Sequence, residues 1–262
     1  MTTYRDIGVE KHGHVAVVEL RRPPNNFFDA ALIGEIAAAL ESLDGDAECR
    51  ALVLAAQGKA FCAGANFGDR DSDGGEILSG PRPGAAHLYI EGNRLFRTKK
   101  PIVAAVHGAA VGGGLGLAMV ADFRVTCPEA RFAANFTRLG FHPGFGLTVT
   151  LPAVIGPTKA ALLFYTSRRI GGEEALKLGL ADVLVPHDKV REAALSLAAE
   201  IAENSPLGLI ATRATLRGDL ADRVRVATER ELAEQTRLRQ TEDFKEGVKA
   251  MAERRRPNFN NR

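Results

Sequence analysis

The 262-residue sequence predicts an α/β fold, because short apolar segments with strand character alternate with amphipathic helical patterns. Residues 14–20, a helical stripe from 32 to 43 and residues 51–55 form the first strand-helix-strand unit. Residues 101–106, the segment after Gly113 and residues 123–126 repeat this alternation. From Pro186 onward long helical patterns take over, at 190–203, 207–217 and 221–239. The chain is long enough to bury a large core.

Local residue chemistry sets the boundaries of the first elements. The strand at residues 14–20 must end before Pro23 and Pro24, because proline cannot continue a strand ladder. Asp29 suits the N-cap of the following helix, since a short carboxylate side chain can accept a hydrogen bond from a free amide of the first turn. A stripe of apolar residues at helical spacing then follows.

Composition narrows the functional class. Hydrophobic residues make up 45% and charged residues 25% of the chain, as in ordinary soluble proteins. A net charge of +2 argues against nucleic-acid binding, and Arg254–Arg256 are interpreted as a solvated helix end. No apolar run reaches the roughly 20 residues of a membrane span, and no signal-peptide pattern is found. We therefore expect a soluble, unprocessed, cytoplasmic protein with no membrane or nucleic-acid partner.

The three cysteines, Cys49, Cys62 and Cys127, are odd in number and lack metal-ligand spacing. They therefore predict neither a disulfide framework nor a metal site, and they favour a reducing compartment. The acidic, glycine-rich and proline-rich stretch between Gly68 and Gly84 is interpreted as a mobile loop near the site. Its acids do not follow the ligand order of a calcium-binding loop.

A triple glycine, Gly112-Gly113-Gly114, is the most informative local feature. Glycines allow a tight turn and close approach of a ligand to the backbone, and the apolar run that follows predicts a buried helix. Free amides at a helix start favour negative charge. A second small-residue turn, Ala63-Gly64-Ala65-Asn66, leaves the strand region at 51–55. The two turns together predict a site built from backbone amides.

These motifs closely resemble the crotonase (enoyl-CoA hydratase/isomerase) family. The resemblance rests on Ala-Phe-Cys-Ala-Gly-Ala-Asn at 60–66 and on Lys-Pro-Ile-Val-Ala-Ala-Val-His-Gly-Ala-Ala-Val-Gly-Gly-Gly at 100–114. Further matches occur at 127–132, 139–146, 151–156 and 175–186, in order along nearly the whole chain. The resemblance implies a crotonase-like spiral of repeated ββα units over residues 1–195. It also implies a C-terminal helical region, 196–262, that forms homotrimers or dimers of trimers.

The resemblance implies an acyl-CoA substrate, with coenzyme A as part of that substrate and no tightly bound cofactor. The thioester carbonyl would lie between the backbone amides of Ala65 and Gly113, which stabilise the enolate formed when charge moves onto the oxygen. Further residues are carried over by motif position as the acyl-CoA binding surface. They are Asn25, Asn26, Ala63, Gly64, Asn66, Phe67, Val111, Gly112, Phe136 and Leu139.

The acid and base of the family's hydratases are absent from this sequence. The first glutamate would stand three residues after the oxyanion glycine, where this chain has Gly116, and the second position is Phe136. An acid that some family isomerases carry after the residue equivalent to Pro143 is replaced by Gly144. Hydratase activity of the ordinary kind therefore does not follow from the resemblance alone, because general acid-base groups each contribute about 10²- to 10⁴-fold.

Several hypotheses stay open. His142 lies on the loop beside the expected pocket and is a candidate acid or base, with a structural role as the alternative. Phe136, Phe141 and Phe145 would give an apolar, aromatic acyl pocket. His107 and Asp122 are interpreted as structural. The function is therefore an acyl-CoA enzyme of hydratase/isomerase type, a noncatalytic acyl-CoA-binding scaffold, or a divergent enzyme that decarboxylates or hydrolyses thioesters.

Overall fold

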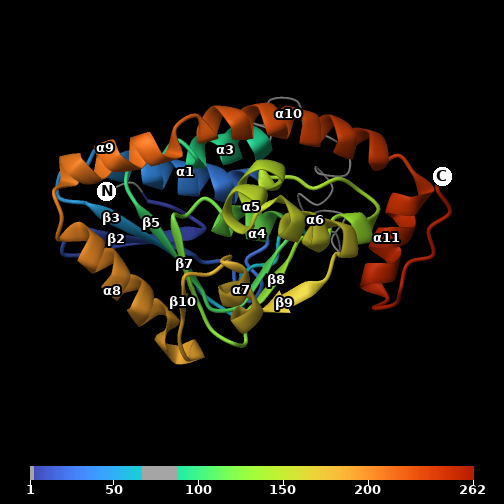
Figure 1. Cartoon of the computed structure of the whole chain (residues 1–262), viewed down its shortest axis with the longest axis horizontal. Helices are drawn as coiled ribbons and strands as arrows, with labels where there is room; N and C mark the ends of the chain where they lie inside the picture. The colour runs from blue at the N-terminus through green and yellow to red at the C-terminus, as the bar shows by residue number, and fades with distance from the viewer. Residues whose placement is uncertain (1–2, 67–87) are drawn as a thin grey trace.

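The computed structural model describes residues 3–66 and 88–262, and its strands form two sheets (Figure 1). The larger sheet has six strands in the order β1-β2-β3-β5-β7-β10, parallel except for the β1–β2 pair. Its strands are β1 (Ile7–His12), β2 (Val15–Leu20), β3 (Ala51–Ala56), β5 (Ile102–Val106), β7 (Phe123–Thr126) and β10 (Val183–Leu184). Every residue of β2 and β5 is buried, as expected for strands covered on both faces.

The smaller sheet contains β4, β6, β8 and β9 in that order. Its strands are β4 (Ala60–Cys62), β6 (Ala109–Val111), β8 (Arg131–Ala133) and β9 (Arg169–Gly171). Consecutive pairs along the chain, β3 with β4, β5 with β6 and β7 with β8, place one strand in each sheet. Helices separate these pairs, so the predicted repetition of two strands and a helix is confirmed.

The helices cover the sheets and form the C-terminal part of the chain. In chain order the helices of the first part are α1 (Ala30–Asp44), α3 (Leu88–Leu95), α4 (Gly113–Ala118), η1 (Thr137–Leu139), α5 (Leu147–Ile155), α6 (Pro157–Thr166), α7 (Gly172–Leu178) and η2 (His187–Lys189). They are followed by α8 (Val190–Ala202), α9 (Pro206–Arg217), α10 (Leu220–Leu238) and α11 (Glu242–Ala252). Asp29 caps α1 as predicted, by accepting a 2.7 Å hydrogen bond from the Leu32 amide.

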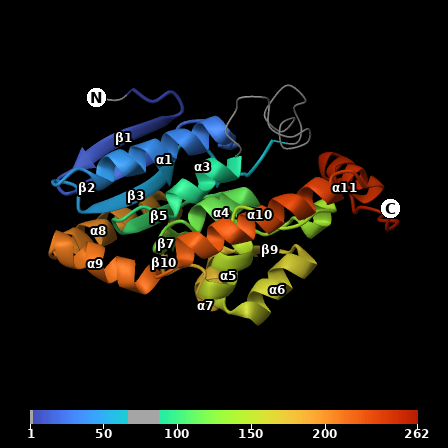
Figure 2. The ribbon, with the colours of Figure 1, turned by 90° about the horizontal axis from the view of Figure 1, so that it is seen from above.

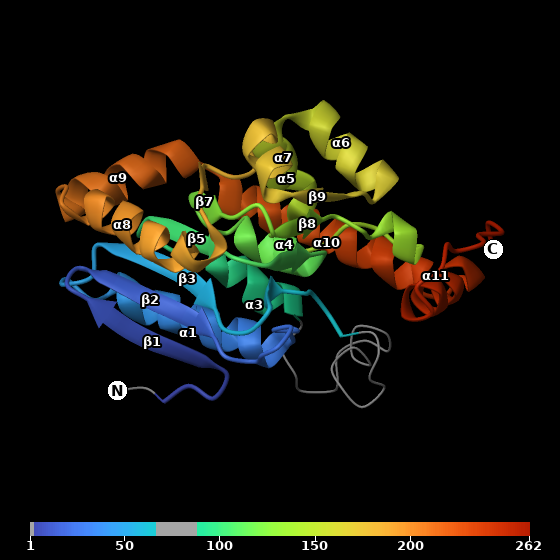
Figure 3. The same cartoon turned by 90° about the horizontal axis from the view of Figure 1, so that it is seen from below.

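The C-terminal helices lie along the core rather than away from it. α8 contacts β3 and β5, while α10 runs past α3 and α5 and ends near α11 (Figure 2). Figure 3 shows α8 and α9 near one end of the molecule and α11 near the other. α11 in turn contacts η1. The C-terminal region therefore reaches the surroundings of the segment 136–147.

Asp122 links α9 to the larger sheet. Its carboxylate accepts a 2.8 Å hydrogen bond from the Ile102 amide of β5. It also pairs with two arginines of α9, at 2.9 Å from Arg213 Nε and 3.0 Å from Arg217 Nε. The predicted structural role of Asp122 is confirmed. His107 also has the expected backbone contact, with Nε2 3.1 Å from the Gly58 carbonyl oxygen.

β1 and α11 are among the elements that the sequence did not predict. β1 is largely exposed and its charged residues hide the strand pattern, whereas α11 begins at a Thr241 N-cap beyond the predicted helices. None of the helices in residues 3–66 and 88–262 combines the length and apolarity needed to cross a bilayer. The predicted division at residue 195 stays a prediction.

Candidate active site

Two small-residue turns, one after β4 and one after β6, lie against each other. β4 and β6 are neighbouring parallel strands, so their carboxyl ends meet at the same edge. Gly64 has a φ of +84°, and a Cβ there would lie 2.7 Å from the Val111 carbonyl oxygen and 3.7 Å from the Gly113 nitrogen. The amides of Ala65 and Gly113 therefore belong to adjoining turns, as the sequence predicted.

Both of these amides are available to a ligand. Gly112 caps α4 with a φ of +55°; its own amide donates to the Ala133 carbonyl at 2.8 Å, and its carbonyl accepts from Leu115. Within the described residues, the N–H groups of Ala65 and Gly113 have no hydrogen-bond partner. Gly113 is buried and Ala65 is half-buried. Because an unpaired buried N–H is costly, these two donors at one edge indicate a site for an oxygen atom of a ligand.

Glycine is required on this side of α4. A Cβ on Gly113 would lie 2.2 Å from Phe28 Cζ, and one on Gly114 would lie 2.0 Å from the Cys62 carbonyl oxygen. Phe28 packs against Gly113 and the Cys62 backbone packs against Gly114. This packing holds the backbone of the first turn of α4 in place. The buried Cys62 thiol beside it has a pKa raised by burial to about 12, which makes it a poor nucleophile.

The turn at Asn25 and Asn26 supports the segment that leads to the Ala65 amide. The buried Asn26 side chain donates to the carbonyls of Gln57 at 2.6 Å and Ala60 at 2.8 Å, while the Ala63 amide donates to the Asn25 carbonyl at 2.9 Å. The Asn26 side chain is thus occupied by the protein. The predicted contact residue Asn66 is half-buried, and Phe67 lies outside the described residues.

An aromatic ring fills the space at Gly116, where the resemblance implies the first family glutamate. Gly116 lies one turn after Gly113 on α4, and a Cβ there would approach Cβ and Cδ1 of Phe145 to 2.8 Å. Phe145 is 2% exposed, has a φ of +60° and packs on Phe28 with ring centroids 5.4 Å apart. A carboxylate at residue 116 is therefore excluded by packing, and the change at this position is more than the loss of a side chain.

The second glutamate position is also aromatic. The Phe136 ring lies 5.6 Å from that of Phe141, which in turn contacts Phe244 of α11 at 5.3 Å. All three rings are buried. The backbone of Leu139, a predicted binding residue, lies against Gly247 of α11. Of the three phenylalanines expected together, Phe136 and Phe141 are in contact and α11 adds Phe244, whereas Phe145 packs on Phe28.

The third position, Gly144, lies beneath a hydrogen-bonded pair from two helices. A Cβ on Gly144 would lie 2.0 Å from the Tyr89 hydroxyl and 2.4 Å from Gln235 Nε2. Tyr89 donates to Gln235 Oε1 at 2.9 Å, and burial raises the pKa of its hydroxyl well above the ordinary value. No acid fits at residue 144 without displacing this pair.

His142 is held on the same loop by its own backbone. Its Nδ1 lies 2.8 Å from the Pro143 carbonyl oxygen, and its carbonyl accepts a 2.9 Å hydrogen bond from Gln235 Nε2. Because a carbonyl can only accept, Nδ1 carries the proton in the neutral ring and Nε2 is the acceptor. The half-buried imidazole can therefore offer Nε2 to a ligand.

Glu231 of α10 is a residue that sequence reasoning missed. It is 1% exposed and accepts hydrogen bonds from the Gly146 amide at 2.8 Å, the Thr148 amide at 3.2 Å and the Thr148 hydroxyl at 2.5 Å. It thus caps α5 and fixes the turn that carries Phe145. Burial raises the pKa of the Glu231 carboxyl. A possible signal was the helical spacing of the buried residues Val224, Thr228, Glu231 and Gln235.

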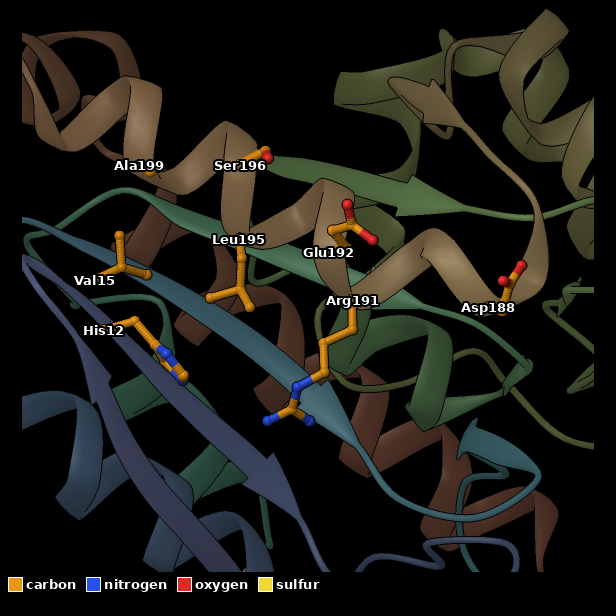
Figure 4. A pocket seen from close by; sticks show the side chains of 8 residues that line it. All are labelled: His12, Val15, Asp188, Arg191, Glu192, Leu195, Ser196 and Ala199. Carbon is orange, nitrogen blue, oxygen red and sulfur yellow. The ribbon is translucent and has the colours of Figure 1, made fainter.

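Two further features bear on a metal centre and on a second binding site. Among the described residues, no three His, Cys, Asp or Glu side chains gather in a way that could hold a metal ion. A groove of about 580 Å³ lies between the β1–β2 hairpin and the segment η2–α8 (Figure 4). It is lined by His12, Val15, Asp188, Arg191, Glu192, Leu195, Ser196 and Ala199, and none of these is a predicted site residue.

Comparison with known proteins identifies the family of the chain. The sequence model of the family described as enoyl-CoA hydratase/isomerase matches residues 10–262. A probable enoyl-CoA hydratase of Bacillus subtilis is 33% identical, over 94% of this chain and 95% of its own. A putative enoyl-CoA hydratase of Thermus thermophilus is 37% identical, over 97% of this chain and 100% of its own.

The fold agrees with solved structures as well. The crystal structure of an enoyl-CoA hydratase/isomerase from Pseudoalteromonas atlantica has a TM-score of 0.87 at 27% identity, covering 98% of this chain and 100% of that one. The crotonase-like fold predicted from the motifs is therefore confirmed.

Proposed function

Because the chain belongs to the enoyl-CoA hydratase/isomerase family, we propose that it binds an acyl-CoA thioester and polarises the thioester carbonyl between the amides of Ala65 and Gly113. The observation that carries this proposal is a pair of N–H groups on adjoining turns, neither of which has a partner within the part of the chain that the structure describes. Coenzyme A enters as part of the substrate, and the chemistry needs no further organic group.

The proposed chemistry is stabilisation of an enolate. When a proton or a carboxyl group leaves the α-carbon, negative charge moves onto the thioester oxygen, and two fixed N–H dipoles lower the energy of that charge. One such donor is worth about 10²- to 10³-fold in rate. The amides require no reorganisation, because Phe28 and Cys62 hold the glycines of α4 in place.

His142 is the proposed acid or base. Its Nε2 is the acceptor of the neutral ring, and the Pro143 carbonyl and Gln235 hold the loop that carries it. His142→Gln removes the imidazole while keeping a polar side chain of similar reach. We expect a loss of about 10²-fold or more in kcat. An unchanged kcat would assign His142 a structural role.

A second candidate is a function without the glutamate pair. Phe145 fills the space at residue 116 and a phenyl ring stands at residue 136, so the site provides an oxyanion site bordered by apolar walls. This favours decarboxylation or thioester hydrolysis of an acyl-CoA, or binding without turnover. Each differs from hydration in its product, namely carbon dioxide, free coenzyme A or none.

The test combines binding with product detection. Calorimetry against a panel of acyl-CoA thioesters measures affinity, and the same panel is assayed for hydration, double-bond shift, carbon dioxide and free coenzyme A. Ala65→Pro removes one N–H, whereas the matched control Ala65→Gly keeps it. We expect turnover of at least one thioester to fall about 10²- to 10³-fold in the proline variant only. Tight binding without any product supports the scaffold, and no binding contradicts both candidates.

We further propose that the protein acts as a homotrimer or a dimer of trimers in the cytoplasm. Apolar side chains of the C-terminal helices are exposed in the single chain, with Leu207 at 80%, Leu216 at 81% and Val226 at 55%. Exposed apolar groups of this kind suit a subunit interface. The three free cysteines are compatible with a reducing compartment. Light scattering after size-exclusion chromatography tests the assembly, and a monomer would contradict it.

A further inference from the structure

Asn135 presents an unassigned polar group beside the proposed oxyanion site. It follows β8 by two residues, where Ala133 accepts the Gly112 amide at 2.8 Å. Its Oδ1 lies 3.5 Å from the point that a Cβ on Gly112 would occupy, on a face of the turn also approached by the Phe136 ring at 3.8 Å. The side-chain amide is therefore next to the residue that precedes the Gly113 donor.

The amide of Asn135 is free to bind a ligand. The side chain is half-buried, and within the described residues neither its oxygen nor its nitrogen has a hydrogen-bond partner. The contrast with Asn26 is informative, since that amide is buried and its nitrogen donates to two carbonyls. A half-buried amide beside a phenyl ring loses free energy unless a ligand or water pairs with it.

The chemistry of an amide limits what Asn135 can do. It offers one acceptor and two donors but does not exchange a proton near neutral pH, so it is a binding group and not a base. The Phe136 ring, which approaches the same turn, offers no hydrogen bond of this kind. Of these two side chains next to Gly112, Asn135 is therefore the one that can recognise a polar group on an acyl chain.

We propose that Asn135 is a specificity-determining residue that hydrogen-bonds an oxygen substituent on the acyl chain near the thioester. The substrate class is an acyl-CoA that carries a hydroxyl, oxo or carboxylate group two or three carbons from coenzyme A. This inference rests on the proposed acyl-CoA function. A site built to pair with such a group discriminates against the analogue that lacks it, because the amide is then left unpaired.

The experiment compares two thioesters that differ by one oxygen. Calorimetry on the whole protein measures the dissociation constants of butanoyl-CoA and 3-hydroxybutanoyl-CoA. We expect about 3- to 10-fold tighter binding of the hydroxylated compound by the native chain, as for one neutral hydrogen bond. Asn135→Ala abolishes the preference while leaving butanoyl-CoA binding within about twofold. The matched control Asn204→Ala, on the exposed end of α8, keeps the preference.

A charge variant supplies an independent readout. Asn135→Asp still accepts a hydroxyl proton but repels a carboxylate, so it should retain 3-hydroxybutanoyl-CoA and bind malonyl-CoA about tenfold or more weakly than the native chain. Equal affinities of the native chain for butanoyl-CoA and 3-hydroxybutanoyl-CoA, or a preference that survives Asn135→Ala, would overturn the inference alone. Failure of every acyl-CoA to bind would instead overturn the proposed function.

Discussion

Two positions on α4, one helical turn apart, have opposite surroundings. At Gly113 the backbone amide has no hydrogen-bond partner among the described residues and lies at the junction of two turns. At Gly116 the space above the backbone is taken by Phe145, whose turn is held by Glu231 of α10. In the proposed function the first position polarises a thioester, whereas a phenyl ring occupies the space where the family resemblance implies an acid.

Under the proposed function, this difference assigns thioester binding and proton transfer to separate parts of the fold. The oxyanion side consists of backbone held by neighbouring strands, so it needs only small residues and a fixed turn. The acid-base side depends on individual side chains, and here tertiary packing by α3, α10 and the segment 144–148 has closed that space. The acid-base side chains can therefore change while the backbone of the oxyanion side is preserved.

The largest effect is expected from Gly64→Ala. The new Cβ would lie 2.7 Å from the Val111 carbonyl oxygen at a φ of +84°, so the two turns must separate. We expect acyl-CoA turnover to fall about 10²- to 10³-fold, since misplaced amides no longer stabilise the enolate. Gly58→Ala is the matched control, with a φ of +88° and a Cβ 2.8 Å from the Pro24 carbonyl oxygen.

Steady-state kinetics and urea unfolding separate the two glycine variants. Both should lose stability because of backbone strain and crowding. At a temperature where each is folded, only Gly64→Ala should lose kcat. Equal losses of kcat in both variants would mean that the effect comes from general strain.

The next effect concerns restoration of the acid at residue 116. Gly116→Glu should lower the free energy of unfolding by about 1–3 kcal/mol through collision with Phe145, and should give no hydratase activity. The pair Gly116→Glu with Phe145→Gly removes the ring and relieves the positive φ of residue 145. We expect stability to recover in part and crotonyl-CoA hydration to appear or rise. Hydration by the single variant would contradict the packing argument.

The Glu231 carboxylate provides a pH-dependent test of the α10 contact. Glu231→Ala leaves the Gly146 and Thr148 amides unpaired and should cost about 1–3 kcal/mol. Glu231→Gln keeps an acceptor but removes the charge. Because burial raises the folded pKa, the native carboxyl favours folding most below its unfolded value of about 4.3 and loses that advantage as pH rises.

Urea unfolding from about pH 4 upward measures this linkage. The stability of Glu231→Gln relative to the native chain should increase as pH rises above the unfolded value, until the native carboxyl is ionised in the folded state too. A difference that is independent of pH would show that Glu231 has the same pKa in the folded and unfolded states.

The smallest effect is expected from Tyr89→Phe. The change removes the hydroxyl that donates to Gln235 above Gly144, with little change in shape. We expect a loss of about 1 kcal/mol in the free energy of unfolding, and a change in KM that is larger than that in kcat if the loop carrying His142 loosens. Thermal unfolding and kinetics on the same preparation provide the two readings.

Much of the fold and half of the site could be predicted from the sequence. Local propensity determines the Asp29 cap, the apolar strands and the glycine turns. Short sequence segments are therefore sufficient to predict them. Glu231 and Asn135 act only through residues 85 and 23 positions away, respectively, at Gly146 and Gly112. β1 was hidden by exposed charges on its outer residues.

The sequence also could not predict that Phe145 occupies the space beside Gly116. The sequence showed an absent carboxylate, but only the positive φ of Phe145 turns its ring toward that glycine. Bulky residues are uncommon at positive φ values, and no local sequence pattern predicts that a phenylalanine will adopt one. Tertiary contacts from α10 stabilise the turn.

The most direct test of the central claim is the infrared carbonyl stretch of a bound thioester labelled with ¹³C at C1. Two N–H donors withdraw electron density from the C=O bond, so binding to the native chain should move the band to lower frequency. Ala65→Pro should reduce that shift and Ala65→Gly should preserve it. A bound thioester whose carbonyl band stays at its frequency in water would contradict an oxyanion site formed by Ala65 and Gly113.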